Sequence, residues 1–367
     1  MGPVPKMNKS TCARVLGTAS ACSNHEPIVP AFLQERHALP RQSVEPWLGL
    51  STTVTLPTRA ARGARVSPEV LAAVLYASCR YLLRAILAGV DGSKGDIVDA
   101  VLLTAIMDAD IGHLDEIAAL GWRYATYADG PPDGFRRPTS VRALSDRLGL
   151  PYETTRRRVE GLIALGRCVR TEHGVHARLI DEPRHHAGSQ ANYAAVRTLL
   201  RDLSSRVPEV DWPKAGASDP KAVEPPLRLV NRRCAAFAVD TLATIADVAG
   251  GYDEALVYMG MIEATGRGAS GDAWPTLRAS SLARSLSQPV PSVRRRLHAL
   301  RTRGLITAQG ARFDARPAPQ VEALVRRLAV ENLKRQQVLF AQLKSLDVSL
   351  GHERVQGPKD ALPRDRG

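Results

Sequence analysis

The chain has 367 residues and a formal net charge of +13 at pH 7, a length that suits two or three domains. Apolar residues make up 44% of the sequence, so sizeable hydrophobic cores can form. This excess of positive charge indicates a polyanionic partner, either nucleic acid or an anionic membrane surface, and it carries no information about the fold.

Secretion, membrane insertion and disulfide bonding are not indicated by the sequence. The first 24 residues hold no apolar run long enough for a signal peptide. The most apolar stretch, residues 97–107, is much shorter than the ~20 residues that span a bilayer. The five cysteines are scattered and odd in number, as expected of free thiols in a reducing compartment. We therefore expect a soluble cytoplasmic protein without a membrane partner.

The first 66 residues differ in composition from those that follow. Residues 1–66 are rich in Pro, Ser, Thr, Ala and Arg and show no sustained period, which predicts a disordered tail. From Ser67 to about residue 90, apolar residues recur at helical spacing and predict a first helix. A second helix is predicted over about 97–108, and a third within 113–128.

A short helix and a longer basic helix are predicted next. Ser140 is placed to cap a helix over 141–148, and Gly149 to end it. The longer helix, over about 152–165, contains "ETTRRRVEGLIALG" and has Gly166 as its stop signal. Two β-prone runs, "CVRT" and "VHARLI", follow and predict a hairpin.

The same order of elements occurs again in the second half. "PSVRRRLHALRTRG" at 291–304 repeats 153–166 with an offset of 138, and "LITAQ" and "RFDAR" predict a second hairpin. The apolar run at 252–264 resembles 97–109. The proline-rich stretch 207–226 separates the two copies, so the sequence predicts a linker there.

Each basic helix has one buried side and one cationic side at 100° per residue. In the first copy the predicted buried residues are Thr155, Val159 and Leu162, and Arg157 projects almost opposite them. In the second copy the predicted buried residues are Val293, Leu297 and Leu300, and Arg295 points away from them. This geometry suits a helix in a DNA major groove, with one residue at base edges and its neighbours at phosphates.

The combination resembles the winged helix-turn-helix of bacterial regulators of the MarR, IclR and GntR types. The matching stretches are "SVRALSDRLGLPYETTRRRVEGLIALG" with "CVRTEHGVHARLI", and "RASSLARSLSQPVPSVRRRLHALRTRG" with "LITAQGARFDAR". The resemblance covers about 45 residues in each half. It implies recognition helices at 152–165 and 290–303, with wing tips near Glu172–Gly174 and Gly310–Ala311.

We therefore expect a mainly α protein with two repeats of a helical bundle plus a winged helix-turn-helix with short β-ribbon wings. The expected divisions are a disordered tail (1–66), a first bundle (67–206) with its helix-turn-helix at about 139–180, a linker (207–226), a second bundle (227–348) with its helix-turn-helix at about 276–316, and a second disordered tail (349–367).

Eleven residues are predicted to contact DNA. Arg157 and Arg295 would reach base edges, while their neighbours and the wing residues would grip phosphates. Arg158 and Arg296 have an alternative, which is to lie along the core edge and pair with an acid. The full set is Thr154, Arg156, Arg157, Arg158, Arg170, His173, Ser292, Arg294, Arg295, Arg296 and Arg312.

The two copies are expected to read different bases, because three positions differ. Ser287 replaces Gly149, Pro291 replaces Glu153, and His298 replaces Glu160. The serine costs turn stability if the position needs a left-handed conformation.

Positive charge is concentrated in these two segments. Residues 136–179 hold ten arginines and four acids, a net +6, and residues 277–316 hold nine arginines and one acid, a net +8. Together they carry +14 against +13 for the whole chain, so the remainder is close to neutral. A charge that serves solubility alone would be spread more evenly.

Other sites are less well indicated. Cys168, His173, His176, His185 and His186, with Asp181, match no established metal-site spacing, and we assign them to a wing and a polar loop. The apolar helices at 97–108 and 252–264 suit a core or a subunit interface, and also an effector pocket. No catalytic motif is present, so we expect neither an enzyme nor a cofactor.

The function expected from the sequence is sequence-specific binding of double-stranded DNA as a nucleoid-associated transcriptional regulator. Two alternatives stay open: a tandem winged-helix replication-initiation or DNA-architectural protein, and a winged-helix protein-interaction module. A homodimer through the long helices and an unidentified small-molecule effector also stay open.

Overall fold

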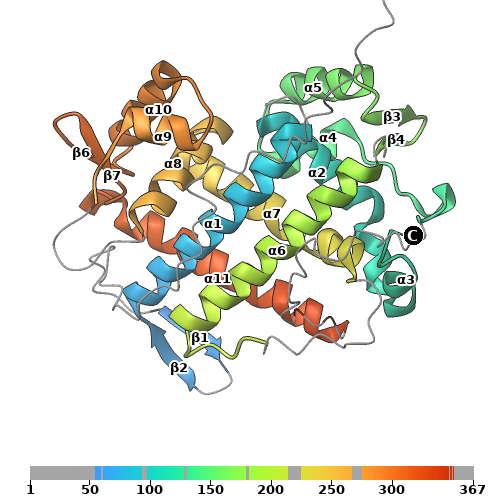
Figure 1. Ribbon diagram of the computed structural model, residues 1–367, viewed down its shortest axis with the longest axis horizontal. Coiled ribbons are helices and arrows are strands. Elements are labelled where there is room, and N and C mark those ends of the chain that lie inside the picture. Colours follow the sequence, from blue (N-terminus) through green and yellow to red (C-terminus); the bar gives the residue numbers. More distant parts are fainter. Residues whose placement is uncertain are drawn as a thin grey trace, which may run out of the picture. The chain divides into compact units, whose positions relative to one another are not determined.

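Helices make up most of the part of the chain that the structure describes, so the expected mainly α class is confirmed (Figure 1). A computed structural model describes residues 54–58, 61–92, 97–127, 130–178, 182–213, 225–266, 275–346, 348 and 350, all within one compact unit, Arg41–Gly367. The helices of this described part are α1 (Pro68–Gly92), α2 (Ile97–Ile111), α3 (Ala118–Arg123), α4 (Val141–Leu148), α5 (Tyr152–Ala164), α6 (Glu182–Arg206), α7 (Leu227–Ala249), α8 (Tyr252–Thr265), α9 (Ala279–Ser285), α10 (Val290–Thr302) and α11 (Glu322–Ser345).

Three small antiparallel sheets accompany these helices in the described residues. Strand β1 pairs with β2, β3 pairs with β4, and β7 lies between β5 and β6. The strands are β1 (Val54–Thr58), β2 (Ala61–Val66), β3 (Cys168–Thr171), β4 (Gly174–Ala177), β5 (Leu277–Arg278), β6 (Thr307–Gln309) and β7 (Arg312–Asp314). Three short 3-10 helices are η2 (Gly112–Glu116), η3 (Asp133–Phe135) and η4 (Pro319–Val321).

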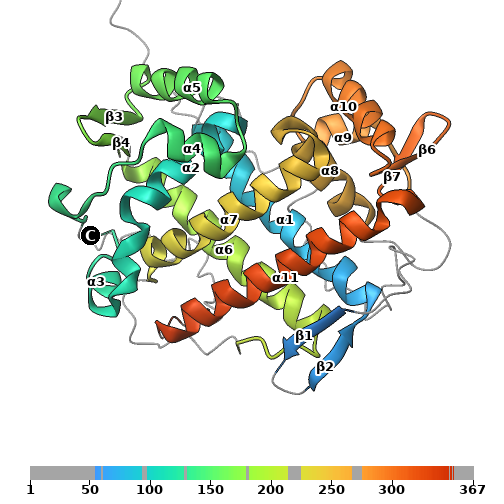
Figure 2. The same cartoon turned by 180° about the vertical axis from the view of Figure 1, so that it is seen from behind.

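Helices from both halves of the sequence share one hydrophobic core. Helix α1 packs against α2 and α6 from its own half and against α8 and α11 from the other half. Helix α7 likewise contacts α2, α6, α8 and α11, and all of these helices meet in the middle of the unit (Figures 1 and 2). The polar contact Gln336 Nε2 to Ser78 Oγ, 2.6 Å, joins α11 to α1 where both side chains are fully buried.

This shared core corrects the expected division into two bundles. The physical reason lies in α1, where Leu71, Ala72, Ala73, Val74 and Tyr76 are all at most 2% exposed and together point to every side of the helix. A helix buried all round needs neighbours on every side. The second half of the chain supplies two of those neighbours, α8 and α11.

The predicted linker is also partly packed into the core. Val207, Val210 and Trp212 are buried, and the Trp212 ring meets Phe340 edge-on at 5.8 Å between ring centroids. Trp212 Nε1 donates a hydrogen bond of 2.9 Å to the Val207 carbonyl. The prolines suggested a linker, but the apolar residues between them pack against the core. Residues 214–224 of the predicted linker lie outside the described residues.

The expected N-terminal tail needs a similar correction. Strands β1 and β2 form an antiparallel hairpin within residues 54–66, where the sequence predicted disorder. The two strands are short and contain Pro57 and Gly63, so they lack the sustained alternation that marks longer strands. Residues 1–53 and 351–367 lie outside the described residues, so the predicted disorder of both ends stays a prediction there.

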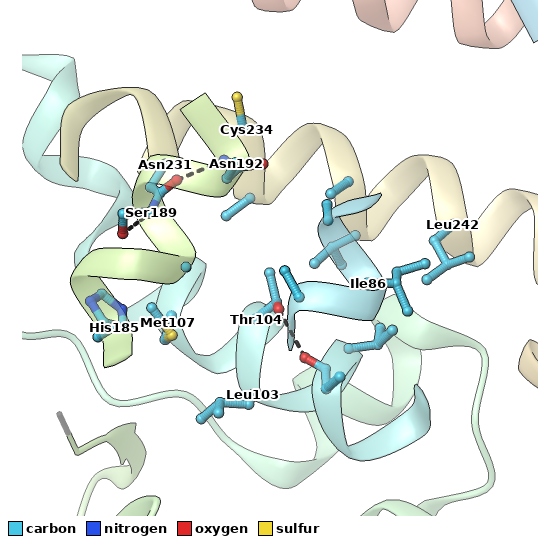
Figure 3. Close-up of a pocket in the computed structure, with 18 of the residues that line it drawn as sticks. Ile86, Leu103, Thr104, Met107, His185, Ser189, Asn192, Asn231, Cys234 and Leu242 are labelled. Atoms are coloured by element: carbon cyan, nitrogen blue, oxygen red, sulfur yellow. Dashed lines mark hydrogen bonds between the residues drawn. The ribbon is translucent and has the colours of Figure 1, made fainter. Parts of the chain in front are cut away.

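The core contains one sizeable cavity between α1, α2, α6 and α7 (Figure 3). Its volume is about 260 Å³, and its labelled lining residues include Ile86, Met107, Asn192 and Leu242. Since protein interiors are otherwise close-packed, a hollow of this size is a distinct feature of the molecule.

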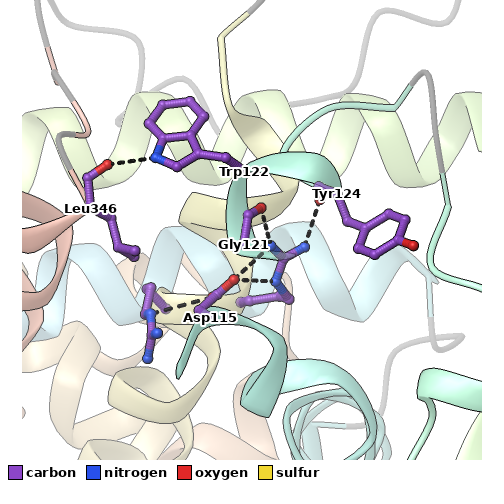
Figure 4. Close-up of polar contacts among 7 residues, drawn as sticks. Asp115, Gly121, Trp122, Tyr124 and Leu346 are labelled. Atoms are coloured by element: carbon purple, nitrogen blue, oxygen red, sulfur yellow. Dashed lines mark hydrogen bonds and ion pairs between the residues drawn. The ribbon is translucent and has the colours of Figure 1, made fainter. Parts of the chain in front are cut away.

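A buried ion pair fixes α7 against η2 and α3 (Figure 4). Arg232 of α7 donates to Asp115 at 2.6 and 2.9 Å, and both side chains are almost fully buried. The same guanidinium donates to the carbonyl oxygens of Tyr124 and Gly121. Trp122 Nε1 donates to the Leu346 carbonyl at 2.8 Å, which joins α3 to the end of α11. These contacts satisfy the charge that would otherwise be costly to bury.

Within the described residues, one helix is long and apolar enough to cross a membrane by length and composition. It is the stretch Pro68–Ala88 of α1, and 78% of its most apolar window is buried inside the protein. Helices α7 and α8 pass the same test only as a pair, across a bend of 96°. The burial of α1 is that of a core helix.

The segments 139–178 and 275–316 share their backbone hydrogen bonds at the offset of 138. Four turn bonds correspond: Leu150 N to Ser145 O and Gln288 N to Ala283 O, Thr155 N to Pro151 O and Val293 N to Pro289 O, Gly166 N to Ile163 O and Gly304 N to Arg301 O, and Arg167 N to Leu162 O and Leu305 N to Leu300 O. The bridge between Thr139 and Val175 corresponds to the pair Leu277 and Phe313. The sequence repeat is therefore also a repeat of local structure.

The turn between the two helices of each segment uses a left-handed residue. Gly149 has a φ of 62°, and the equivalent Ser287 has a φ of 51°. Ser287 is the one non-glycine residue with a positive φ in the described part of the chain. The left-handed conformation costs an L residue about 1–2 kcal/mol, while glycine loses roughly 0.5–1 kcal/mol more backbone entropy on folding.

We predict that Ser287→Gly raises the free energy of unfolding by about 0.5 kcal/mol, the difference between these two effects. Chemical denaturation followed by circular dichroism measures the change. The reciprocal variant Gly149→Ser should lower stability by a similar amount, because no atom lies within 4 Å of a Cβ placed there and only the backbone conformation matters. A loss of stability in Ser287→Gly would contradict the assignment.

Candidate nucleic-acid interface

Helix α5 presents a buried stripe and an exposed cationic side, as the sequence predicted. Thr155, Val159 and Leu162 are its buried residues, and Arg157 on the other side is exposed. The preceding helix α4 begins at the predicted cap, where Ser140 Oγ accepts from Ala143 N at 3.1 Å, and ends at the left-handed Gly149. Local sequence signals therefore place α5 at the surface.

Helix α10 has the same arrangement. Its buried residues are Val293, Leu297 and Leu300, as predicted, and Arg294 and Arg295 are exposed. No ion pair or hydrogen bond joins the side chain of Arg157, Arg294 or Arg295 to another described residue. These three guanidiniums are consequently available to a partner.

Each helix is followed by a hairpin whose turn lies at the predicted tip. Thr171 pairs with Gly174 across the first turn, and Gln309 pairs with Arg312 across the second. The second hairpin gains a third strand, β5, which pairs with β7; a single bridge at Thr139 takes its place in the first segment. The sequence analysis missed this strand because two residues are too few to show an alternating pattern.

Two arginines of the triplets hold the helices to the core. Arg158 lies 3.2 Å from Asp99 at the start of α2, and Arg296 lies 2.7 Å from Asp253 at the start of α8. The Arg296 side chain is only 11% exposed. The structure thus favours the alternative that we gave for these two residues, pairing with an acid at the core edge, and we leave them out of the proposed contact set.

The remaining predicted contact residues of the first segment are partly neutralised by acids. Arg156 lies 3.0 Å from Glu153, and Arg170 lies 2.5 Å from Glu160. The bond with Glu153 raises the pKa of Arg156, which stays charged. Both pairs are exposed on both partners, and such pairs contribute little to stability. A phosphate can therefore compete for either arginine.

The last predicted contacts are weaker candidates or are engaged elsewhere. Arg312 on the second hairpin donates to Thr276 through its Nε (2.7 Å) and Nη2 (3.1 Å). Exposed His173 has its Nε2 3.1 Å from Glu172 Oε1. Thr154 and Ser292 are half-buried near the starts of α5 and α10.

One exposed cation escaped the sequence analysis. Arg301 lies seven residues after Arg294 on α10, which returns it to nearly the same face, and it is exposed. The equivalent position in α5 is Ile163, so the first copy gave no reason to select it. The acids Asp99 and Asp253 were also missed, because a contact with a distant helix leaves no mark on the local pattern.

The segments 139–178 and 275–316 are joined to the shared core by polar contacts. Arg147 of α4 binds Asp108 of α2 at 2.7 Å and Asp240 of α7 at 3.0 Å. Burial raises the pKa of Asp108, and Arg147 only partly opposes that effect. The hydroxyl of Tyr252, at the start of α8, donates 2.8 Å to the Leu148 carbonyl at the end of α4. The first segment is thus fastened to the helix that carries the second.

The histidines considered for a metal site do not all lie where the sequence placed them. His173 and His176 belong to the hairpin, as expected, but His185 and His186 lie in α6 rather than in a polar loop. That helix begins at Glu182, so both histidines lie in its first two turns. Within the described ranges no three His, Cys, Asp or Glu side chains gather as metal ligands, and Asp181 lies outside those ranges.

No protein-family model, no curated protein and no solved structure matches this chain.

We predict that Tyr252→Phe lowers the free energy of unfolding by about 1–2 kcal/mol, because the buried Leu148 carbonyl loses its donor. Thermal or urea unfolding measures the effect. Tyr152→Phe is the matched control, since Tyr152 is 43% exposed, and its change should stay within ~0.5 kcal/mol. Equal effects of the two changes would show that the inter-segment bond contributes nothing.

Proposed function

We propose that this protein binds double-stranded DNA sequence-specifically through two winged helix-turn-helix units, and that it acts as a transcriptional regulator. The observation that carries the proposal is the equivalent placement of Arg157 and Arg295. Each is exposed, opposite a buried three-residue stripe, on the second helix of a helix-turn-helix that a hairpin follows. Such a helix fits the major groove, where Arg to guanine is the commonest specific contact.

Two helices on one framework suit a single DNA duplex. In both views α5 and α10 lie at the same end of the described unit, with α1 and α7 between and beneath them (Figures 1 and 2). One chain then supplies two recognition helices, and no dimer is needed to bring them together. Binding to the chromosome would place the protein at the nucleoid.

The two units differ in their electrostatics, which supports different roles. On α5, Glu153 and Glu160 pair with two arginines, Arg156 on the same helix and Arg170 on β3. On α10, the equivalents are Pro291 and His298, so Arg294, Arg295 and Arg301 face solvent without an acid on the same helix. We assign most of the salt-dependent affinity to α10, since phosphate contacts dominate that term.

We predict that Arg157→Ala and Arg295→Ala each weaken binding to the preferred site about 5- to 150-fold, the equivalent of ~1–3 kcal/mol, with a smaller effect on random DNA. Arg156→Ala and Arg294→Ala should weaken both kinds of DNA more evenly and reduce the salt slope by about 1. Fluorescence anisotropy at several salt concentrations measures both quantities.

The matched control for these variants is Arg327→Ala, an exposed arginine on α11 outside both units. It should bind as the unchanged protein does. If the four contact variants weakened binding to specific and to random DNA equally, the division between base and phosphate contacts would be wrong. If the unchanged protein ignored duplex DNA at low salt, the proposal itself would fail.

We further predict that Glu153→Gln and Glu160→Gln tighten binding to random DNA at low salt, because each removes a negative charge that competes with phosphate for an arginine. The same anisotropy titration detects the change. Asp146→Asn is the control for the loss of any acid, since Asp146 pairs with Arg142 on α4. Weaker binding in both glutamate variants would show that these residues contact bases instead.

A genome-wide footprint separates this proposal from its nearest rival. A regulator protects sites beside promoters, whereas a replication-initiation or DNA-architectural protein protects iterated repeats or many unrelated sites. A winged-helix protein-interaction module would give no footprint at all. The exposed guanidiniums of α10 favour DNA over that last option.

A further inference from the structure

The cavity between α1, α2, α6 and α7 has apolar walls and one polar edge (Figure 3). Most of its lining is aliphatic, including Ile86, Leu103 and Leu242. The polar edge comes from α6 and α7, where Ser189, Asn192 and Asn231 lie close together. A hollow with a mostly apolar wall and a few grouped polar atoms is the usual form of a small-molecule site.

The polar edge is a chain of hydrogen bonds that keeps some capacity for a ligand. Tyr81 OH donates to Asn192 Oδ1 at 3.0 Å, Asn192 Nδ2 donates to Asn231 Oδ1 at 2.6 Å, and Asn231 Nδ2 donates to Ser189 Oγ. Each carboxamide nitrogen has two hydrogens; Asn192 also hydrogen-bonds the Cys234 thiol, whereas Asn231 Nδ2 has one bond, to Ser189, and keeps one hydrogen for a ligand. The edge can therefore donate hydrogen bonds to an oxygen that enters the cavity.

The charge of the lining favours an anion. Arg167 and Arg178 line the cavity, and none of its lining residues is Asp or Glu. The Cys234 thiol on the wall stays neutral, because burial raises its pKa to about 12. Arg178 is exposed, so the cavity reaches solvent at this end and a ligand can enter.

The volume limits the size of the ligand. A cavity of about 150 Å³ holds benzene, with six non-hydrogen atoms. By that scale the 260 Å³ present here accommodates about ten non-hydrogen atoms. A medium-chain or aryl carboxylic acid has this size, an apolar body and one anionic end.

We propose that this cavity is a binding site for a small amphipathic carboxylic acid, whose apolar body lies among the α1, α2 and α7 side chains and whose carboxylate binds the polar lining, which includes Asn231 and the two arginines.

The site touches the parts that carry the first helix-turn-helix. Thr104 and Met107 of the cavity wall belong to α2, whose Asp99 holds Arg158 of α5. The backbone of Arg178 donates 2.8 Å to the Arg167 carbonyl at the base of the hairpin. A ligand that shifts either contact changes the position of α5, so its binding is coupled to that of DNA. Only this coupling rests on the proposed function.

The test uses the full chain and three probes of nearly equal length: octanoate, 1-octanol and octylammonium. Calorimetry without DNA should show saturable 1:1 binding of octanoate with a Kd of ~1 mM or tighter, and a raised Tm. The alcohol should bind at least several-fold more weakly, and the ammonium not at all. Absence of octanoate binding, or equal binding of the three probes, overturns the proposal.

Two variants place the ligand in the cavity. Ala238→Phe fills the hollow from α7 and should abolish octanoate binding, while Ala194→Phe, exposed on α6, should leave it unchanged. If Ala238→Phe does not fold, Ala85→Leu on the α1 wall makes the same test. Arg178→Gln, on an exposed side chain, should reduce the preference for octanoate over octanol. Binding that survives a folded, filled variant overturns the location.

The coupling between octanoate and DNA is measured separately. Saturating octanoate should change the DNA affinity of the unchanged protein and leave that of the Ala238→Phe variant as it is. Octanoate binding without any DNA binding would refute the proposed function and leave the ligand site intact. DNA binding without octanoate binding would refute the ligand site and leave the proposed function intact.

Discussion

The burial of α1 on every side is the constraint on which the rest of the structure depends. A helix of this composition cannot face water, so helices from both halves must cover it. That requirement brings α8 beside the first half and places α2 and α8 where they can hold the two arginine-bearing helices. The shared core determines which side of α5 and α10 is buried. The opposite side of each helix is therefore the one that faces solvent.

Much of the local structure could be predicted from the sequence, because its causes lie within a few residues. The Ser140 cap, the turn at Gly149 and the buried stripes of α5 and α10 each depend on near neighbours. The same reasoning indicated that Arg158 and Arg296 had two alternatives, and the structure favours the pairing with acids. The function and its contact residues stay predictions.

The shared core could not be predicted, because its causes lie far apart in the chain. Nothing beside Trp212 in the sequence indicates that Phe340 will cover it, and nothing beside Arg158 indicates Asp99. A stretch rich in proline was therefore interpreted as a linker, and a short hairpin as a tail. An effector pocket was one of the uses that the sequence offered for the apolar helix at 97–108, and that helix does line the cavity. The other walls could not be predicted, because they come from helices that meet only in the folded protein.

The two copies keep their backbone and change their surface. Corresponding turn bonds match at a fixed offset, and even Ser287 adopts the conformation of the glycine it replaces. The side chains around the exposed arginines differ, with two glutamates on α5 and none on α10. The two copies thus share the backbone that the core requires and differ on the face that is exposed.

The common core also limits the evolutionary history open to this chain. An ancestor formed by fusing two identical modules could at first have lost either one and survived. Once α1 came to rely on α8 and α11 for its cover, deletion of one module would strip the other of its interior. The two modules are therefore inseparable in the present chain, and substitutions are least constrained on the outer, solvent-facing helices.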